Sequence, residues 1–191
     1  MRFINKQTIE INRELSDLDS FTIGFVNILK KHTSYVIVSG YVAILLGRAR
    51  ASEDIDIIIP KIDFSTFQTF YHDLKKEGFY CLNAEDEHIV YSYLEDNLAI
   101  RFAKKDTIIP NIELKWIKHE FDRIALEKRI TVQIQQNFLH ISPLELQIAF
   151  KEEILRSPKD IEDAEHIRNV AKDHIDEDMI KKYKEKLHGF Y

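Results

Sequence analysis

The stretch of sequence that decides the fold runs from Tyr35 to Ile59 and reads YVIVSGYVAILLGRARASEDIDIII. Residues 35–38 form an apolar run typical of a buried strand, and the small pair Ser39-Gly40 interrupts it. A short helix is predicted from about Tyr41 to Leu46. The isoleucine-rich segment Asp54–Ile59 then predicts a second strand, which begins with Asp-x-Asp. The segment therefore predicts a strand, a tight turn, a helix and a strand that starts with two acids.

The pair Ser39-Gly40 and the two aspartates indicate a site for phosphate and metal. Glycine lets the backbone turn tightly, and the first amides of the helix that follows are unpaired and ready to bind phosphate. Because side chains alternate along a strand, Asp54 and Asp56 lie on one face, with Cα atoms about 7 Å apart. Two such carboxylates repel each other unless a cation lies between them, and oxygen ligands favour Mg²⁺ or Mn²⁺.

This pattern resembles the DNA polymerase β-like nucleotidyltransferase superfamily. Its signature is a small-Gly pair that opens a helix, a later Asp-h-Asp-h-h-h strand (h, apolar) and a third acid at the centre of another strand. Ser39-Gly40, Asp54–Ile59 and Glu113 in Ile112-Glu113-Leu114 match these parts. Ser-Gly stands where the superfamily usually has Gly-Gly or Gly-Ser, and Glu113 stands where Asp is usual.

Further segments are similar to those of small prokaryotic members, among them the abortive-infection toxin nucleotidyltransferases. One segment is Arg48-x-Arg50-x-Ser52-x-Asp54, and another is Lys151 followed by Arg156-x-x-Lys159-Asp160-x-x-Asp163. The resemblance thus covers about residues 35–163. It leaves open whether Lys151, Asp160 and Asp163 act in the site, because acids in the first turn of a helix also complement its dipole.

The resemblance implies Mg²⁺-dependent transfer of a nucleoside monophosphate from an NTP to an acceptor hydroxyl, with two Mg²⁺ (or Mn²⁺) ions. Asp54 and Asp56 would ligate both ions, and Glu113 would ligate the ion that activates the acceptor. The residues that would bind the nucleotide are Ser39, Gly40, Arg50 and Lys151. The acceptor is open: RNA, a protein or a small hydroxylated molecule all fit, and a small partner protein is possible.

Alternatives remain at this stage. Glu95 and Asp106 are rivals of Glu113 for the third carboxylate, and Arg48 and Arg50 could order a loop instead of touching substrate. A non-catalytic regulatory or antitoxin-like partner that keeps the same fold is the second function considered. A metal-dependent phosphodiesterase is the third, since Asp-x-Asp alone permits it.

Strand and helix patterns interleave up to about residue 141 and only helical patterns follow, which predicts a mixed α/β sheet core with a C-terminal helical appendage. We therefore divide the chain into a nucleotidyltransferase core, residues 1–141, and a helical segment packed on it, residues 142–191. The predicted helices are 18–32, one capped by Asp63 and closed at Gly78, 119–128, and three that begin at Ser142, at Ser157 and near Asp176. The predicted strands are Ile112–Ile117 and two hairpins, 88–94 with 97–103 and 130–134 with 138–141.

The composition excludes several classes of protein. A single cysteine, Cys81, excludes an internal disulfide framework and a Cys-based zinc site, and we expect a reducing cytoplasm. The longest apolar run, Tyr41–Leu46, is far too short to cross a bilayer, and residues 1–6 lack the pattern of a signal peptide. With 27 Lys and Arg against 32 Asp and Glu, the net charge of −5 argues weakly against a dedicated nucleic-acid coat.

Overall fold

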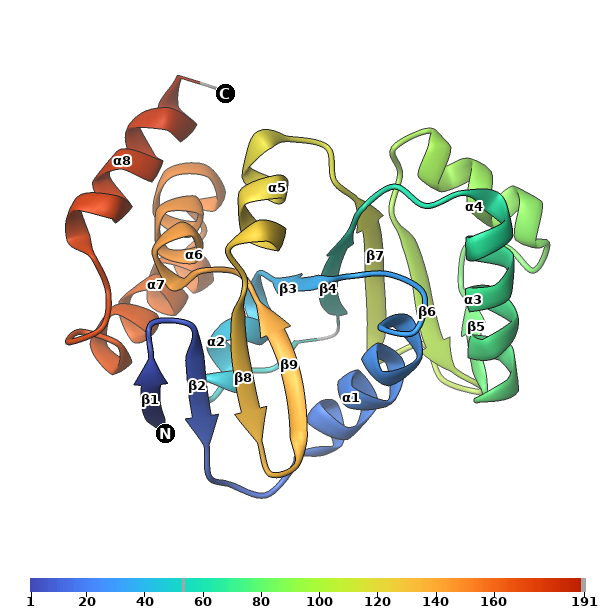
Figure 1. Cartoon of the computed structure of the whole chain (residues 1–191), viewed down its shortest axis with the longest axis horizontal. Coiled ribbons are helices and arrows are strands. Elements are labelled where there is room, and N and C mark those ends of the chain that lie inside the picture. Colours follow the sequence, from blue (N-terminus) through green and yellow to red (C-terminus); the bar gives the residue numbers. More distant parts are fainter. Residues whose placement is uncertain (53, 190–191) are drawn as a thin grey trace.

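The computed structural model describes residues 1–52 and 54–189 of the chain. In this part of the chain nine strands form one mixed sheet in the order β1-β2-β8-β9-β3-β4-β7-β6-β5 (Figure 1). The strands are β1 (Arg2–Asn5), β2 (Thr8–Ile11), β3 (Val36–Val38), β4 (Asp54–Ile59), β5 (Phe79–Cys81), β6 (Ile100–Lys104), β7 (Asn111–Trp116), β8 (Ile130–Ile134) and β9 (Asn137–Ile141). The helices are α1 (Asp17–Leu29), α2 (Gly40–Leu45), α3 (Phe64–Lys76), α4 (Glu87–Glu95), α5 (Glu120–Glu127), α6 (Leu144–Phe150), the π-helical turn η1 (Lys151–Leu155), α7 (Pro158–Val170) and α8 (Glu177–His188). The predicted class, a mixed α/β sheet followed by C-terminal helices, is confirmed.

Strand β4 lies at the centre of the sheet and positions the predicted acids. It runs antiparallel to β3, where Val38 is opposite Asp56, and parallel to β7, where Asp56 is opposite Glu113. The predicted bounds of β4 are correct to the residue. The end of β3, the start of β4 and the middle of β7 therefore meet in one region.

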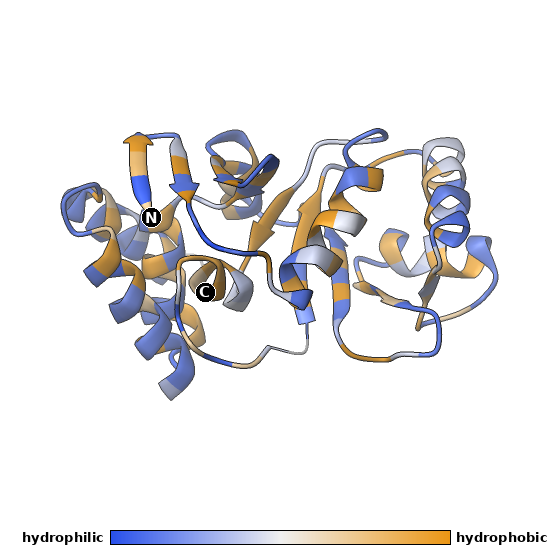
Figure 2. Ribbon diagram, turned by 90° about the horizontal axis from the view of Figure 1, so that it is seen from below, coloured by the Kyte–Doolittle hydropathy of each residue, from blue (hydrophilic) through white to orange (hydrophobic). Residues whose placement is uncertain are grey.

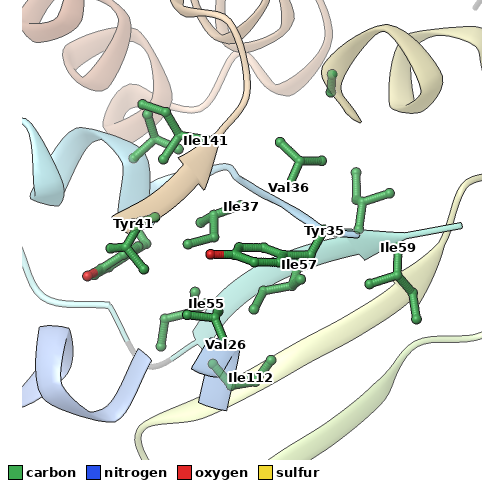
Figure 3. Packing of buried hydrophobic residues seen from close by; sticks show 14 of the residues in the cluster. Val26, Tyr35, Val36, Ile37, Tyr41, Ile55, Ile57, Ile59, Ile112 and Ile141 are labelled. Atoms are coloured by element: carbon green, nitrogen blue, oxygen red, sulfur yellow. The ribbon is translucent and has the colours of Figure 1, made fainter. Parts of the chain in front are cut away.

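The two faces of β4 differ in chemistry because side chains alternate along a strand. Ile55, Ile57 and Ile59 are fully buried, and Figure 3 shows Ile55 and Ile57 clustered with Val26 of α1 and Ile112 of β7. In Figure 2 the central strands are largely hydrophobic, whereas the outer helices mix both kinds of residue. Burial at about 25 cal/mol per Å² of apolar surface makes this layer the main source of stability. The acids occupy the opposite face.

Helix ends follow the predicted chemistry at most positions. Asp63 accepts a hydrogen bond from the Thr66 amide at the start of α3. Gly47 and Gly78 have positive φ angles of 99° and 75°, which only glycine adopts without strain, and they close α2 and α3. Ser157 and Asp176 cap α7 and α8 as predicted; those residues are the N-caps with side-chain hydrogen bonds.

The predicted hairpin of residues 88–94 with 97–103 is wrong, because its first half is helix α4. The Asp86 side chain accepts hydrogen bonds from the amides of residues 88 and 89 and begins the helix. Val90 and Leu94, four residues apart, bury one helical face against the core. A run of apolar residues fits the repeat of a strand as well as that of a helix. The signal that distinguishes the two here is the Asp86 cap, which the sequence interpretation did not use.

Two further differences concern the ends of the sheet. The hairpin of β1 and β2 was not predicted; β2 joins the sheet by pairing in parallel with β8. Ser142 was predicted to cap α6, but Pro143 is the N-cap and makes no side-chain hydrogen bond. The Ser142 amide instead donates to the Ile37 carbonyl at 2.9 Å, so this residue extends the contact between β9 and β3.

Within residues 1–52 and 54–189, no helix has both the length and the apolar character needed to span a membrane.

Candidate active site

Three acidic side chains share one face of two neighbouring strands. Asp54 and Asp56 lie on β4, and Glu113 lies on β7 directly opposite Asp56. Two of them, Asp56 and Glu113, are largely enclosed, since each side chain is 17% exposed. The rivals for the third carboxylate, Glu95 and Asp106, are exposed at the end of α4 and beyond β6. The sheet therefore brings together the three acids that the sequence pattern selected.

Two basic side chains of the sheet neutralise these acids. Lys115 follows Glu113 by two residues on the same face, and its Nζ atom lies 3.2 Å from Oδ1 of Asp56 and 4.0 Å from Oε1 of Glu113. Arg101 on β6 donates to Oε2 of Glu113 at 2.5 Å. Burial raises the pKa of Asp56 above its usual value; Lys115 opposes this shift, whereas Glu113 and Asp54 reinforce it. Burial and the two neighbouring acids therefore both disfavour the charged form of Asp56, and Lys115 favours it.

The three acids have the donor chemistry of metal ligands. Hard carboxylate oxygens on adjacent strands are the donor type that Mg²⁺ prefers. Among the described residues, however, no three His, Cys, Asp or Glu side chains are grouped so that they could hold a metal ion. Asp56 and Glu113 are turned toward Lys115 and Arg101 instead. The donor types therefore fit magnesium, while their present partners are the chain's own cations.

The turn between β3 and α2 is strained at Ser39, which has φ 64° and ψ −138°. A residue other than glycine in such a region costs about 1–3 kcal/mol and is most often kept at functional sites. Gly40, by contrast, lies close to another side chain: a Cβ atom there would lie 3.1 Å from both terminal nitrogens of Arg50, so the guanidinium would have to shift. The sequence interpretation assigned the tight turn to Gly40, whereas the unusual backbone angles belong to Ser39.

Behind this turn lies a buried ion network centred on Asp163 of α7. Its carboxylate is fully buried and accepts hydrogen bonds from Arg48, from Nη1 of Arg50 at 2.7 Å and from Nζ of Lys151 at 2.8 Å. Asp160 also accepts from Lys151, at 3.4 Å. Asp160 and Asp163 thus hold cations, and they lie in the interior rather than beside the acids of the sheet.

Lys151 is 1% exposed, and burial lowers its pKa to about 8. Asp160 opposes that shift, and Arg50 adds to it by repulsion between like charges. The network therefore fixes the guanidinium of Arg50 against Gly40 and the ammonium of Lys151 below the turn. The predicted nucleotide-binding residues Ser39, Gly40, Arg50 and Lys151 are assembled in one region.

A cavity of about 210 Å³ opens beside this region, between the sheet and the helices α5, α6 and η1. Its polar lining residues are Ser39, Asp56, Lys115, Asp122, Ser142, Gln147 and Lys151. The rest is mainly apolar, and its side chains include Ile58, Phe121, Ala125, Leu146 and Phe150. The cavity connects Asp56 of β4 with the strained turn and with the C-terminal helices.

Sequence reasoning missed the residues that complete the site. Lys115 could have been found, because it lies two residues from Glu113 and therefore on the same face of a strand. Arg101 could not, since its role depends on the pairing of β6 with β7. Gln147 of α6, another lining residue of the cavity, has no motif of its own.

Comparisons with known proteins add little to this geometry. No protein-family model matches the chain, and no curated protein sequence matches it. Among solved structures, an antigenic nucleotidyltransferase-like protein from Paracoccidioides brasiliensis is similar, with 18% identity over 83% of this chain and 78% of that chain. The TM-score is 0.49, and a structural similarity at this level carries no argument about the family or the activity.

Proposed function

We propose that the chain is a nucleotidyltransferase, which moves a nucleoside monophosphate from an NTP to an acceptor hydroxyl. The observation that carries the proposal is the placement of Glu113 directly opposite Asp56, with Asp54 on the same face. The strained Ser39 turn borders the same cavity as Asp56. Acids beside a cationic region suit a reaction in which a negatively charged phosphate chain is attacked by a hydroxyl.

Each residue has a defined task in this proposal. Asp54, Asp56 and Glu113 would hold Mg²⁺ or Mn²⁺, in a pair of ions that would stabilise the charge that develops at the α-phosphate. Glu113 would also accept the proton of the attacking hydroxyl. Ser39 and Gly40 would position the outer phosphates, with Arg50 and Lys151 as the nearby positive charges. The acceptor is RNA, a protein or a small hydroxylated molecule.

The test is transfer of label from each of the four α-³²P-labelled NTPs, with Mg²⁺, to total cellular RNA and to total cellular protein. We expect the wild type to label one acceptor class. The double substitution Asp54→Asn/Asp56→Asn keeps the side-chain shapes and should lower transfer at least about a hundredfold, because removing ligands that stabilise charge costs several kcal/mol. Asp96→Asn, at an exposed helix end, is the matched control. Equal transfer by the double variant and the wild type would refute the assignment.

A second candidate is a non-catalytic regulatory or antitoxin-like partner that keeps the fold. The observation that favours it is the pairing of Asp56 and Glu113 with Lys115 and Arg101, which occupies the acids without any metal. This candidate predicts no transfer, no binding of Mg·NTP, and co-purification of a small helical protein encoded beside the chain. Detection of Mg·NTP binding by calorimetry would argue against it.

A further inference from the structure

Gln147 of α6 is a largely buried polar residue whose side chain lines the cavity of about 210 Å³. It is 6% exposed. Within the described residues its side-chain amide makes no hydrogen bond, although most buried amides in proteins make several. The amide atoms of Gln147 keep access to the cavity, so a ligand there can bond to them without displacing another residue.

The cavity has the size and the division of polarity that a ring with one polar edge requires. At about 210 Å³ it is smaller than the 300–1,000 Å³ of pockets that enclose drug-sized ligands, so it suits one ring system rather than a whole nucleotide. Side chains such as Ile58, Ala125 and Leu146 supply flat apolar contact. Gln147 offers an adjacent donor and acceptor, the pair of groups that recognises the edge of a nucleobase.

The position of the cavity relative to the charged residues identifies which part of a substrate enters it. Ser39, Asp56 and Lys151 are among its polar lining residues. A molecule with phosphates beside these three residues would place its uncharged ring against the apolar remainder. An acceptor that carries further negative charge would gain nothing from these apolar walls.

We propose that this cavity binds the nucleobase of the NTP, and that Gln147 reads its edge through the side-chain amide. The inference rests on the proposed function for the direction in which the nucleotide lies. The inference goes beyond the proposed function because it assigns the base a site formed by α5, α6 and β4. It also names Gln147 as the residue that determines base specificity. The ligand class is a nucleoside triphosphate whose base presents a neighbouring donor and acceptor.

The experiment measures binding rather than transfer. Affinities of wild type and Gln147→Leu for ATP, GTP, CTP, UTP and inorganic triphosphate are determined by calorimetry in Ca²⁺ buffer. Leucine has nearly the same size and suits an apolar cavity, so the variant should fold; thermal unfolding checks this. We expect the affinity for the preferred NTP to fall about tenfold and to approach that of the other three, while triphosphate binding is unchanged. Gln136→Leu, in the exposed turn between β8 and β9, is the matched control.

A second variant tests the cavity independently of its polar group. Ala125→Leu adds volume to the wall of the cavity. It should lower the affinity for all four NTPs and leave the affinity for inorganic triphosphate unchanged. Unchanged affinity for NTPs in both variants, or an equal loss for triphosphate, would overturn the inference. If the wild type binds no NTP, the inference and the proposed function both fail. If NTPs bind through Gln147 and no transfer occurs, the base site stands and only the proposed function fails.

Discussion

Lys115 is the residue whose charge a metal ion would have to replace. Its ammonium lies 3.2 Å from Asp56 and 4.0 Å from Glu113, in the region where a divalent cation would bind both acids. We predict that Lys115→Met raises the affinity for Mn²⁺ about tenfold, since removing a competing positive charge from a half-buried site is worth about 1–2 kcal/mol. Titration followed by the electron paramagnetic resonance of free Mn²⁺ measures it. Lys118→Met, on the exposed surface, should change nothing, and equal affinities in all three proteins would contradict the prediction.

Lys151 makes stability depend on pH in the alkaline range. Burial lowers its pKa from 10.5 to about 8, so between these values the unfolded chain holds a proton that the folded chain has released. The free energy of unfolding therefore rises with pH in this window, and below pH 8 the cost of burying the ammonium is present in full.

We predict that the wild type gains about 1–2 kcal/mol relative to Lys151→Met between pH 8 and pH 10, because each pH unit contributes at most about 1.4 kcal/mol. Urea unfolding of both proteins at several pH values measures the difference. Parallel stability curves for the two proteins across this range would show that Lys151 keeps its proton.

Ion pairs hold helix α7 against the segment that follows α2 and against η1, and Asp163 makes three of them. Asp163 accepts hydrogen bonds from Arg48 and Arg50, which follow α2, and from Lys151, which begins η1. We predict that Asp163→Asn lowers the free energy of unfolding by about 3–5 kcal/mol, because Arg50 then loses the charge of Asp163, and Arg48 and Lys151 are left with Glu162 and Asp160 respectively. Glu165→Gln, on the exposed side of the same helix, should cost less than about 0.5 kcal/mol. Chemical denaturation measures both, and a loss of similar size in the two variants would refute this role of Asp163.

The elements that could be predicted from the sequence are those with a single strong pattern. In β4, Asp54 and Asp56 alternate with isoleucine before the strand becomes wholly apolar. Helices α3 and α7 begin at the recognisable N-caps Asp63 and Ser157. Helix α4 was misread because its apolar residues fit both a strand and a helix. The π-helical turn η1 depends on how Lys151 reaches its buried partners, and no local pattern predicts that.

At the scale of the whole molecule, the class of fold was predictable and the order of the strands was not. Asp56 and Glu113 are 57 positions apart by their numbers, and only the parallel pairing of β4 with β7 brings them together. The resemblance to a superfamily predicted only that a third acid lies on a later strand, and it did not predict which strand pairs with β4. The cations around the acids depend on long-range packing, because Arg101 comes from β6 and Lys115 from β7.

The edge of the sheet has a consequence for the newly made chain. Strand β2 contributes the buried Ile9 and Ile11, yet its neighbour toward the centre of the sheet is β8, residues Ile130–Ile134. At a synthesis rate of about 5–20 residues per second, β2 leaves the ribosome some 6–25 s before that neighbour exists. During this interval its two isoleucines have no native sheet edge to join. Strand β2 therefore completes its pairing in the sheet only after a segment about 120 residues later in the chain has been made.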